Sequence, residues 1–277
     1  MPNPRDLCDL AGAKAYIVPA LSATTASDAV LGAIIAGVSR SIEAYLGREL
    51  MAETWTEMRN GTGQQRLALK HFPAIGVTSL TIETSAIPAA GKPPTASWGG
   101  YTFDDRFVYL SPGYLGYPNH FPRGAQNVQI VYSAGYITPG MIAVAALPAW
   151  AASADYEANA EVVANGYVFA TAAGGVSGTV APAWGAQLGA SVADGTVTWQ
   201  ATGEAVSLFP GAQLLPDGIR LAAMQQVALV FKQRTRVGDS GTGEGPQRVN
   251  YMMKPLHPTT CAMLDPYRDW AFPGDAY

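Results

Sequence analysis

The sequence has few charged residues and few cysteines. Charged side chains make up 14% of its 277 residues, against roughly 25% in ordinary globular domains. The net charge is −4, and binding to a phosphate backbone depends on clustered lysine and arginine, so the charge balance does not favour a general nucleic-acid-binding protein. Cys8 and Cys261 lie near opposite ends of the chain, which indicates reduced thiols and neither a disulfide framework nor a zinc site.

Long apolar runs are also missing. No run approaches the roughly 18 consecutive apolar residues that read as a membrane-spanning helix. The first residues, MPNPRDLCDL, show neither the basic region nor the apolar stretch of a secretion signal. We therefore expect synthesis in the cytoplasm without secretion, and no membrane partner.

No motif indicates catalysis. The three histidines, His71, His120 and His257, are too scattered to suggest a metal site or a nucleophile and its base. No serine lies in a G-x-S-x-G turn. We therefore expect no enzyme activity, no catalytic residue, no cofactor and no metal.

Two motifs leave an alternative open. The pair Asp104-Asp105 could hold a cation or act as acid and base, although a turn with solvated carboxylates is the favoured interpretation. The run GDSGTGEG, residues 238–245, resembles a phosphate-binding loop. It follows a predicted helix and lacks the Lys-Ser or Lys-Thr pair of such loops, so we interpret it as a linker.

Apolar periodicity predicts two long helices and a short one near the N-terminus. The short helix is expected over residues 6–17. The first long helix should have Ser27 as its N-cap and Gly47 as its C-cap. The second should run from Pro216 to about Val237, and it is apolar nearly all round, which predicts burial or contact with another subunit. We expect the two long helices to pack together.

The second long helix is also expected to meet a neighbouring copy. The residues expected on this inter-subunit face are Leu221, Met224, Ala228 and Leu229.

Between the long helices the apolar spacing changes to that of strands. The run TWTEMRNGTGQQRLALKHFP predicts a hairpin around Asn60-Gly61. Further strands are expected at Val77–Glu83, Phe107–Ser111 and Val128–Tyr132. These strands predict a small antiparallel sheet.

The charge pattern indicates an inserted module. No lysine or arginine occurs from Gly124 to Ile219. Within this stretch, residues 161–163, 167–171 and 196–200 have strand-type composition between glycine-rich turns. We expect an all-β module at residues 150–203 inserted into a core formed by residues 1–149 and 204–277. The predicted fold class is therefore α+β, with a helical core of two long helices plus short terminal helices, the small antiparallel sheet and the inserted module.

The C-terminal segment, residues 248–270, has the composition of a docking element. RVNYMM is strand-like, and PTTCAMLDPYRDW predicts a final short helix. Such a segment can add a strand to a partner's sheet edge; alternatively, it folds back on its own core. The expected docking contacts are Arg248, Tyr251, Met252, Met253, Leu264, Tyr267 and Trp270.

Several motifs follow one another in a characteristic order. The predicted first long helix ends in SIEAYLGREL, FPAIGVTSL follows at residues 72–80, YSAGY at 132–136 and LDPYRDW at 264–270. In this order they resemble the head-to-tail connector (adaptor) proteins of tailed phages, in which IEAYLGR, P-I-x-x-V-x-S, Y-x-A-G-Y and L-x-P-Y-R occupy the corresponding places. The module at residues 150–203 departs from that family, which has a short loop there, and looks like a small β unit of phage structural proteins.

The resemblance implies a structural protein of the virion neck, assembled in the host cytoplasm. Such proteins form a ring of about twelve copies, bind the portal protein and connect it to the next neck or tail-completion protein. Genomic DNA passes through the lumen without specific binding. The C-terminal segment would then be the portal-docking element.

Two other functions remain open from the residues alone. Trp150, Trp184 and Trp199 could form a stacking surface for sugars in a carbohydrate-binding or host-attachment protein of the virion, if they are exposed on one face. A hydrolase would need a cleft with paired carboxylates.

Overall fold

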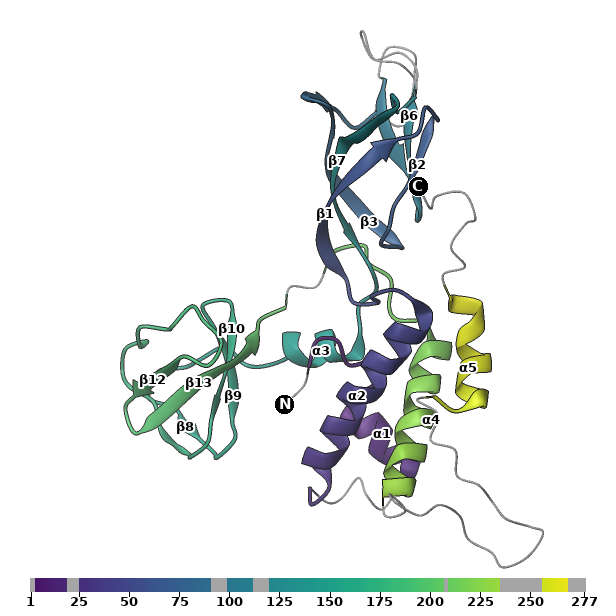
Figure 1. The fold of residues 1–277 in the computed structure, drawn as a ribbon. Helices are drawn as coiled ribbons and strands as arrows, with labels where there is room; N and C mark the ends of the chain where they lie inside the picture. Colours follow the sequence, from purple (N-terminus) through teal and green to yellow (C-terminus); the bar gives the residue numbers. More distant parts are fainter. Residues whose placement is uncertain are drawn as a thin grey trace, which may run out of the picture. The chain divides into compact units, whose positions relative to one another are not determined.

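The computed structural model of the chain describes residues 3–18, 25–90, 99–111, 120–206, 209–234 and 256–268. Helices and antiparallel sheets both occur in it (Figure 1), so the predicted α+β class is confirmed. The chain divides into two compact units. The first unit comprises Met1–Gly47, Thr138–Leu208 and Leu215–Tyr277, and the second comprises Arg48–Ile137 and Phe209–Leu214.

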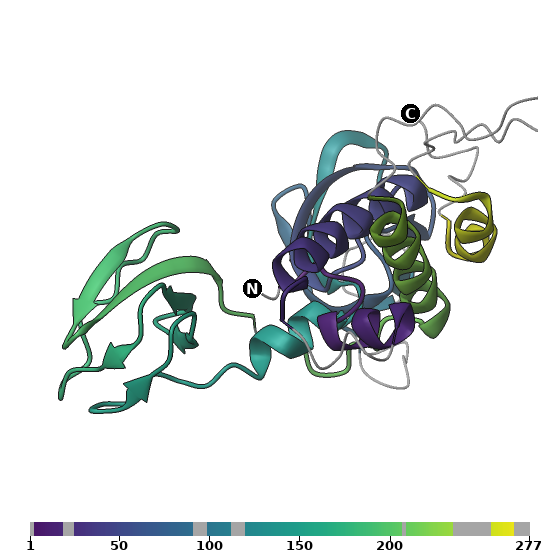
Figure 2. The same ribbon diagram turned by 90° about the horizontal axis from the view of Figure 1, so that it is seen from below.

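The helices belong to the first unit. They are α1 (Leu10–Ile17), α2 (Asp28–Leu46), α3 (Pro139–Ala145), α4 (Asp217–Gln233) and α5 (Pro258–Leu264), which continues into the 3₁₀-helix η3 (Asp265–Tyr267). Helix α4 lies between α2 and α5, and α1 contacts both α2 and α4 (Figures 1 and 2). The predicted packing of the two long helices is therefore confirmed.

Helix α2 shows why this arrangement forms. Leu31, Ile35, Val38, Ile42 and Leu46 recur at helical spacing and are buried, and burial stabilises each such side chain by about 1.5–3 kcal/mol. Gly47 ends the helix with a φ of 71°, as predicted, because glycine adopts this left-handed conformation without strain. By length and hydropathy alone α2 could cross a membrane, but its buried stripe belongs to the core of the helices.

One predicted helix start is wrong. Helix α1 begins at Leu10 and not at Asp6, because the Asp9 side chain accepts a hydrogen bond from the Gly12 N–H and caps the helix. Ser27 occupies the N-cap position of α2, as predicted, although its side chain forms no capping hydrogen bond. Helix α4 ends at Gln233, and residues 235–237 of the predicted helix lie outside the described residues.

Helix α3 was not predicted. Thr138 caps it by accepting a hydrogen bond of 3.0 Å from the Met141 N–H, and Pro139 occupies the first turn. A threonine followed by proline before an apolar run is a recognised helix start, so the signal was present in the sequence.

The second unit consists of two facing antiparallel sheets. The four-stranded sheet has the order β1-β7-β3-β4 and the three-stranded sheet the order β2-β6-β5. Their bounds are β1 (Glu53–Gly61), β2 (Arg66–Ala68), β3 (Ala74–Ile82), β4 (Ser85–Ile87), β5 (Gly100–Phe103), β6 (Phe107–Ser111) and β7 (Gly124–Ala134). One core cluster contains buried residues of both sheets, such as Ile130, Leu80, Val108 and Tyr101, so the core lies between them.

The predicted hairpin around Asn60-Gly61 is wrong. Strand β1 continues through both residues and pairs with β7, whereas β2 pairs with β6. Neither residue has the positive φ of a type I′ turn. The Asn60 carbonyl oxygen Oδ1 accepts a hydrogen bond from the Gln126 N–H, and the Gly61 N–H donates to Asn127 Oδ1. These hydrogen bonds hold Asn60 and Gly61 against β7. A Cβ on Gly61 would lie 1.8 Å from the carbonyl oxygen of Pro122, just before β7, so this close approach requires glycine.

The predicted module region is entirely β. It contains β8 (Asp155–Tyr156), β9 (Glu161–Ala164), β10 (Tyr167–Thr171), β11 (Gly175–Val176), β12 (Ser191–Asp194) and β13 (Val197–Glu204). Strands β12-β13-β10-β9 form one sheet and β11-β8 another. The three predicted strands correspond to β9, β10 and β13. The domain boundaries at residues 150 and 203 stay a prediction.

Candidate interaction surfaces

The described part of the C-terminal segment folds back on its own helices. Gln226 of α4 is buried, and its Oε1 accepts hydrogen bonds from the His257 N–H at 3.0 Å and from the Thr260 hydroxyl at 3.1 Å. The Tyr45 hydroxyl of α2 donates to Asp265 at 2.5 Å. Helix α5 and η3 thus contact both long helices, and we call residues 256–268 the C-terminal clasp.

Two of the predicted docking residues, Leu264 and Tyr267, lie in the clasp. Leu264 is fully buried, so it stabilises the chain's own core in this conformation and is not exposed to a partner. Tyr267 is half-buried and lies close to Gly218, where an added Cβ would approach the tyrosine hydroxyl to 2.5 Å. The remaining predicted docking residues, Arg248, Tyr251, Met252, Met253 and Trp270, lie outside the described residues.

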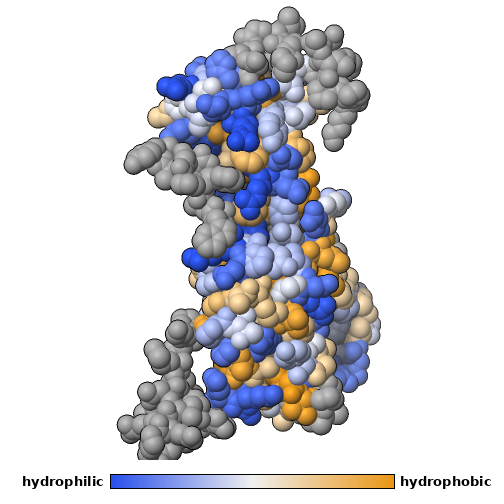
Figure 3. Space-filling model, turned by 90° about the vertical axis from the view of Figure 1, so that its right-hand side faces the viewer, coloured by the Kyte–Doolittle hydropathy of each residue, from blue (hydrophilic) through white to orange (hydrophobic). Residues whose placement is uncertain are grey.

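The predicted inter-subunit face of α4 is only partly exposed. Leu221 is 42% exposed, whereas Ala228 is buried within the chain. Met224 and Leu229 are half-buried. On α2, Val30 is 48% exposed. Figure 3, which views the molecule from the side of α5, shows apolar side chains among polar ones on the surface of the helices.

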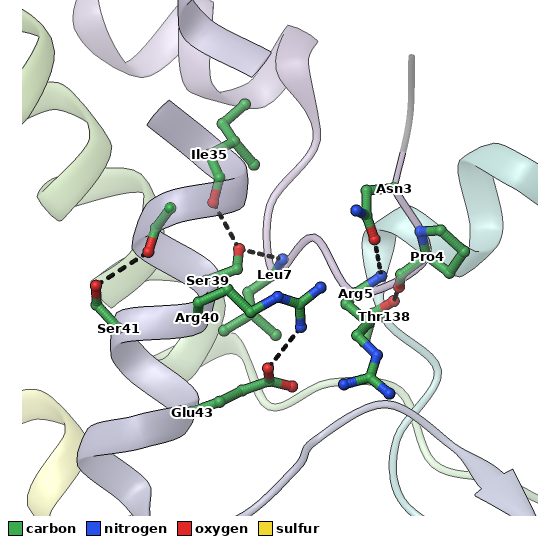
Figure 4. Close-up of polar contacts among 11 residues, drawn as sticks. Asn3, Pro4, Arg5, Leu7, Ile35, Ser39, Arg40, Ser41, Glu43 and Thr138 are labelled. Carbon is green, nitrogen blue, oxygen red and sulfur yellow. Dashed lines mark hydrogen bonds and ion pairs between the residues drawn. The ribbon is translucent and has the colours of Figure 1, made fainter. Parts of the chain in front are cut away.

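The N-terminal residues are attached to α2 and to the start of α3 by polar contacts (Figure 4). The Leu7 N–H donates to the buried Ser39 hydroxyl at 3.0 Å, and that hydroxyl donates to the Ile35 carbonyl at 2.8 Å. The Thr138 hydroxyl donates to the Pro4 carbonyl. These hydrogen bonds satisfy buried polar groups and hold the segment before α1 in one conformation.

Asp6 is a buried carboxyl group within this attachment. Its Oδ2 accepts a hydrogen bond from the Asn3 N–H at 3.1 Å, while its Oδ1 is buried without a hydrogen-bond partner. Burial raises the pKa of Asp6 from 3.8 to about 6, although the hydrogen bond from Asn3 and the charge of Arg40 act in the opposite direction. The ionised form is thus disfavoured in the folded chain.

We expect Asp6→Asn to stabilise the chain increasingly as the pH rises from about 4 to about 6. The folded-state pKa of Asp6 lies above the unfolded-state pKa, so ionisation of Asp6 destabilises the wild-type fold. This destabilisation is absent below about pH 4 and is complete above the folded-state pKa. The difference in melting temperature between the variant and wild type should grow by about 2–4 °C over this pH range. This shift corresponds to about 1 kcal/mol of stability once solvent screening of the charge is allowed for. Thermal melts at matched pH values measure it, and a pH-independent difference would contradict it.

The tryptophans of the module pack against one another and do not form a display surface. Trp199 is fully buried, and Trp150 and Trp184 are half-buried. The ring centroids of Trp184 lie 6.2 Å from Trp150 and 6.4 Å from Trp199. The exposed tryptophan face required for the carbohydrate-binding interpretation is therefore not present.

Asp194 organises this cluster. Its Oδ2 accepts hydrogen bonds from the indole N–H groups of Trp150 at 2.8 Å and Trp199 at 3.0 Å, and its Oδ1 accepts one from the Gly178 N–H at 2.7 Å. Burial alone would raise the pKa of Asp194, but these hydrogen bonds hold it below its ordinary value. The ionised carboxylate is thus part of the module's core.

His71 lies in a polar cluster of the second unit. Its ring stacks on Trp55 with 3.5 Å between centroids, and its backbone N–H donates to the Tyr132 hydroxyl, which donates to Glu57 at 2.5 Å. Burial lowers the pKa of His71, although the charge of Glu57 acts in the opposite direction. Burial raises the pKa of Tyr132, and the hydrogen bond to Glu57 acts in the same direction. The His71 Nε2 lies 3.9 Å from Glu57 Oε1, which is too far for a hydrogen bond. We therefore interpret this cluster as one that holds the fold together.

Asp104 adopts the turn role that the sequence favoured. Its Oδ1 accepts hydrogen bonds from the N–H groups of Arg106 and Phe107, and its Oδ2 accepts one from the Tyr109 hydroxyl. Among the described residues, no group of three or more histidine, cysteine and acidic side chains is arranged to hold a metal ion.

Gln226 and Ser39 are the residues that sequence reasoning missed. Both are polar at positions where the helical period requires a buried side chain, since Ala222, Ala223 and Val227 are buried around Gln226 on α4. A polar residue within a buried helical stripe indicates a specific hydrogen-bond partner, but the sequence does not say which segment provides it.

Comparison with known proteins finds a family model that matches part of the chain. Residues 14–150 match the model of a family described as "Head completion protein". Among solved structures, a chain of the "Neck of empty GTA particle computed with C6 symmetry" is similar, with 14% sequence identity and a TM-score of 0.38 over 97% of this chain and 96% of that chain. That likeness is too distant to carry a functional argument. No curated protein matches the sequence.

Proposed function

We propose that the chain is a structural protein of the neck of a tailed phage or phage-like particle, because residues 14–150 match the model of the head completion protein family. The family match is the observation that carries this proposal. It agrees with the motif order that resembles phage connector proteins.

In the full proposal the chain is a ring adaptor between the portal and the next neck or tail-completion protein. A ring of about twelve copies needs a surface on each copy for its neighbours. Leu221 of α4 and Val30 of α2 are large apolar side chains that remain exposed in the single chain, and such residues favour burial at a contact between subunits. Of the predicted inter-subunit residues, Leu221, Met224 and Leu229 stay in this proposal, whereas Ala228 is already buried.

The portal contact is assigned to the C-terminal part of the chain. The clasp buries Leu264 against the chain's own helices, so Leu264 is left out of the proposed portal contact. The contact then comprises Arg248, Tyr251, Met252, Met253, Tyr267 and Trp270. Residues 1–149 and 204–277 would form the connector core, with residues 150–203 as an inserted module.

Passage of DNA without specific binding is supported by charge. The net charge is −4, and residues 124–219 contain no lysine or arginine. A surface of this kind offers few contacts to phosphates, so the duplex can slide past it. A non-enzymatic role agrees with the structural use of His71 and Asp104.

Co-assembly with the portal protein of the same phage tests this proposal. Full-length chain and portal are mixed and imaged by negative-stain electron microscopy, and a ring of this chain bound to the portal is expected. Portal particles without added density would reject the neck role.

We expect Leu221→Glu to reduce ring formation at least tenfold. The substitution places a charge in an apolar contact, which is costly when no partner charge compensates it. Gln233→Glu, at the exposed end of the same helix, is the matched control and should assemble normally. Normal rings with Leu221→Glu would remove α4 from the subunit contact, while the neck role would stand.

A further inference from the structure

Asn165 and Gly166 form the tip of the β9–β10 hairpin in the module. Their neighbours Ala164 and Tyr167 pair and close a two-residue turn. Both turn residues have a positive φ, 46° for Asn165 and 78° for Gly166, as in a type I′ turn, and both are exposed. Asparagine is thermally labile, most of all before glycine, because no Cβ hinders the attack of the glycine nitrogen on the side-chain amide.

Few contacts restrain this turn. Among the described residues, the Gly166 N–H donates to no acceptor. The Asn165 Nδ2 donates to the Trp184 carbonyl at 3.5 Å, which is long for a hydrogen bond. An added Cβ on Gly166 would meet no heavy atom within 4 Å, so the space beside the turn is open. An exposed hairpin tip of this kind opens at low cost.

The other Asn-Gly pair of the sequence, Asn60-Gly61, is held in strand β1. The Gly61 N–H donates to Asn127 Oδ1 at 2.8 Å, and the Asn60 Oδ1 accepts a hydrogen bond from the Gln126 N–H at 2.7 Å. Gly61 is also buried, and an added Cβ there would lie 1.8 Å from the Pro122 oxygen. The nitrogen that would react at Gly61 is therefore engaged, and no room is left for a ring beside it.

We propose that Asn165 is a site of spontaneous deamidation in the folded chain and that Asn60 is protected from it. The backbone nitrogen of Gly166 loses its proton to hydroxide and forms a bond to the side-chain carbon Cγ of Asn165. The bond from Cγ to Nδ2 breaks, and Nδ2 takes up a proton from water and leaves as ammonia. The product of this step is a cyclic imide.

Water then opens the imide in one of two directions. Cleavage of the bond between Cγ and the Gly166 nitrogen gives aspartate. Cleavage of the bond between the backbone carbonyl carbon of residue 165 and the same nitrogen gives isoaspartate, in which the chain runs through Cγ. One amide is hydrolysed overall and nothing is oxidised or reduced, so water is the only co-reactant.

The two products change the module in different ways. Both replace the Nδ2 donor to Trp184 with a carboxylate, in a region that has no lysine or arginine to pair with it. Isoaspartate also adds a methylene to the backbone of a turn that fits only two residues. Because β9 and β10 supply Val162 and Phe169 to the module's core, isoaspartate should lower the stability of the module. This inference does not depend on the neck role.

Peptide mapping by mass spectrometry after incubation of the full-length chain at mildly alkaline pH tests the site. Chymotrypsin is the suitable protease, because residues 124–219 offer trypsin no lysine or arginine. In water labelled with heavy oxygen, the peptide that contains Asn165 should gain the label. Its deamidation should be at least tenfold faster than that of Asn60, since a nucleophile held away from its target reacts much more slowly.

The same chain unfolded in urea is the matched control. Both Asn-Gly pairs lose their contacts there, so the two rates should become similar. Asn165→Gln should remove the labelling of this peptide in the folded chain, because the longer side chain would have to close a larger ring. Equal rates at the two asparagines of the folded chain overturn the proposal, and so does a folded chain in which Asn165 gains no label although the unfolded chain gains it.

Thermal melts followed by tryptophan fluorescence test the effect on the module. Asn165→Asp carries the new charge without the additional backbone atom, so it should melt as fresh wild type does. Wild type that has accumulated isoaspartate should show its transition at a lower temperature. If this material melts as fresh wild type does, the turn does not control the pairing of β9 with β10, and the proposed effect on the module is wrong.

Discussion

A chain that ends at Gly245 should unfold about 6–12 °C below the full-length chain. The truncation removes the C-terminal clasp, in which Leu256 and Leu264 are buried. Losing these two side chains costs about 3 kcal/mol or more. It also leaves the buried Oε1 of Gln226 without the two hydrogen bonds that it accepts from the clasp, which adds a further cost.

Differential scanning calorimetry of two truncated chains measures this effect. A chain that ends at Arg268 keeps the clasp and is the matched control, so its melting temperature should equal that of the full-length chain. Leu264→Asp should reproduce the loss without shortening the chain. If the chain ending at Gly245 melts normally, the clasp makes no contribution to the core, and its residues are free to serve the portal contact.

Asp194→Leu should destabilise the module by about 4 kcal/mol, because it leaves three N–H donors without an acceptor. Two of them are the indole groups of Trp150 and Trp199, and the third is the Gly178 N–H. Tryptophan fluorescence should report the loss as a red shift at a lower temperature than in wild type, since Trp199 is fully buried in the folded chain. Asp155→Leu, at an exposed aspartate of the same module, should leave this transition unchanged.

The lowered pKa of Asp194 also predicts how the stability of the module depends on pH. The stability due to its carboxylate is present above the ordinary aspartate pKa of 3.8 and is lost as the pH falls through the lower folded-state value. The fluorescence transition of wild type should therefore move to lower temperature at acid pH, and that of Asp194→Leu should move less. An equal shift in both proteins would show that another group controls the acid response.

Local signals in the sequence determined the elements that depend on neighbouring residues alone. The apolar period of α2 and its end at Gly47 were predicted because a helix stripe and a glycine cap are formed by residues within a few positions of one another. Strand β6 was predicted at its observed bounds for the same reason, since its alternation is complete within five residues. The α+β class follows from such elements.

Only the tertiary structure decided how distant segments use their polar groups. Asn60-Gly61 has the composition of a tight turn, but contacts with Gln126 and Asn127, 66 positions away, keep it in a strand. Gln226 receives its partners from residues 31 and 34 positions away, so the clasp could not be read from α4 or α5 alone. The physical reason is that hydrogen-bond capacity belongs to a residue, whereas its partner depends on the packing of the whole chain.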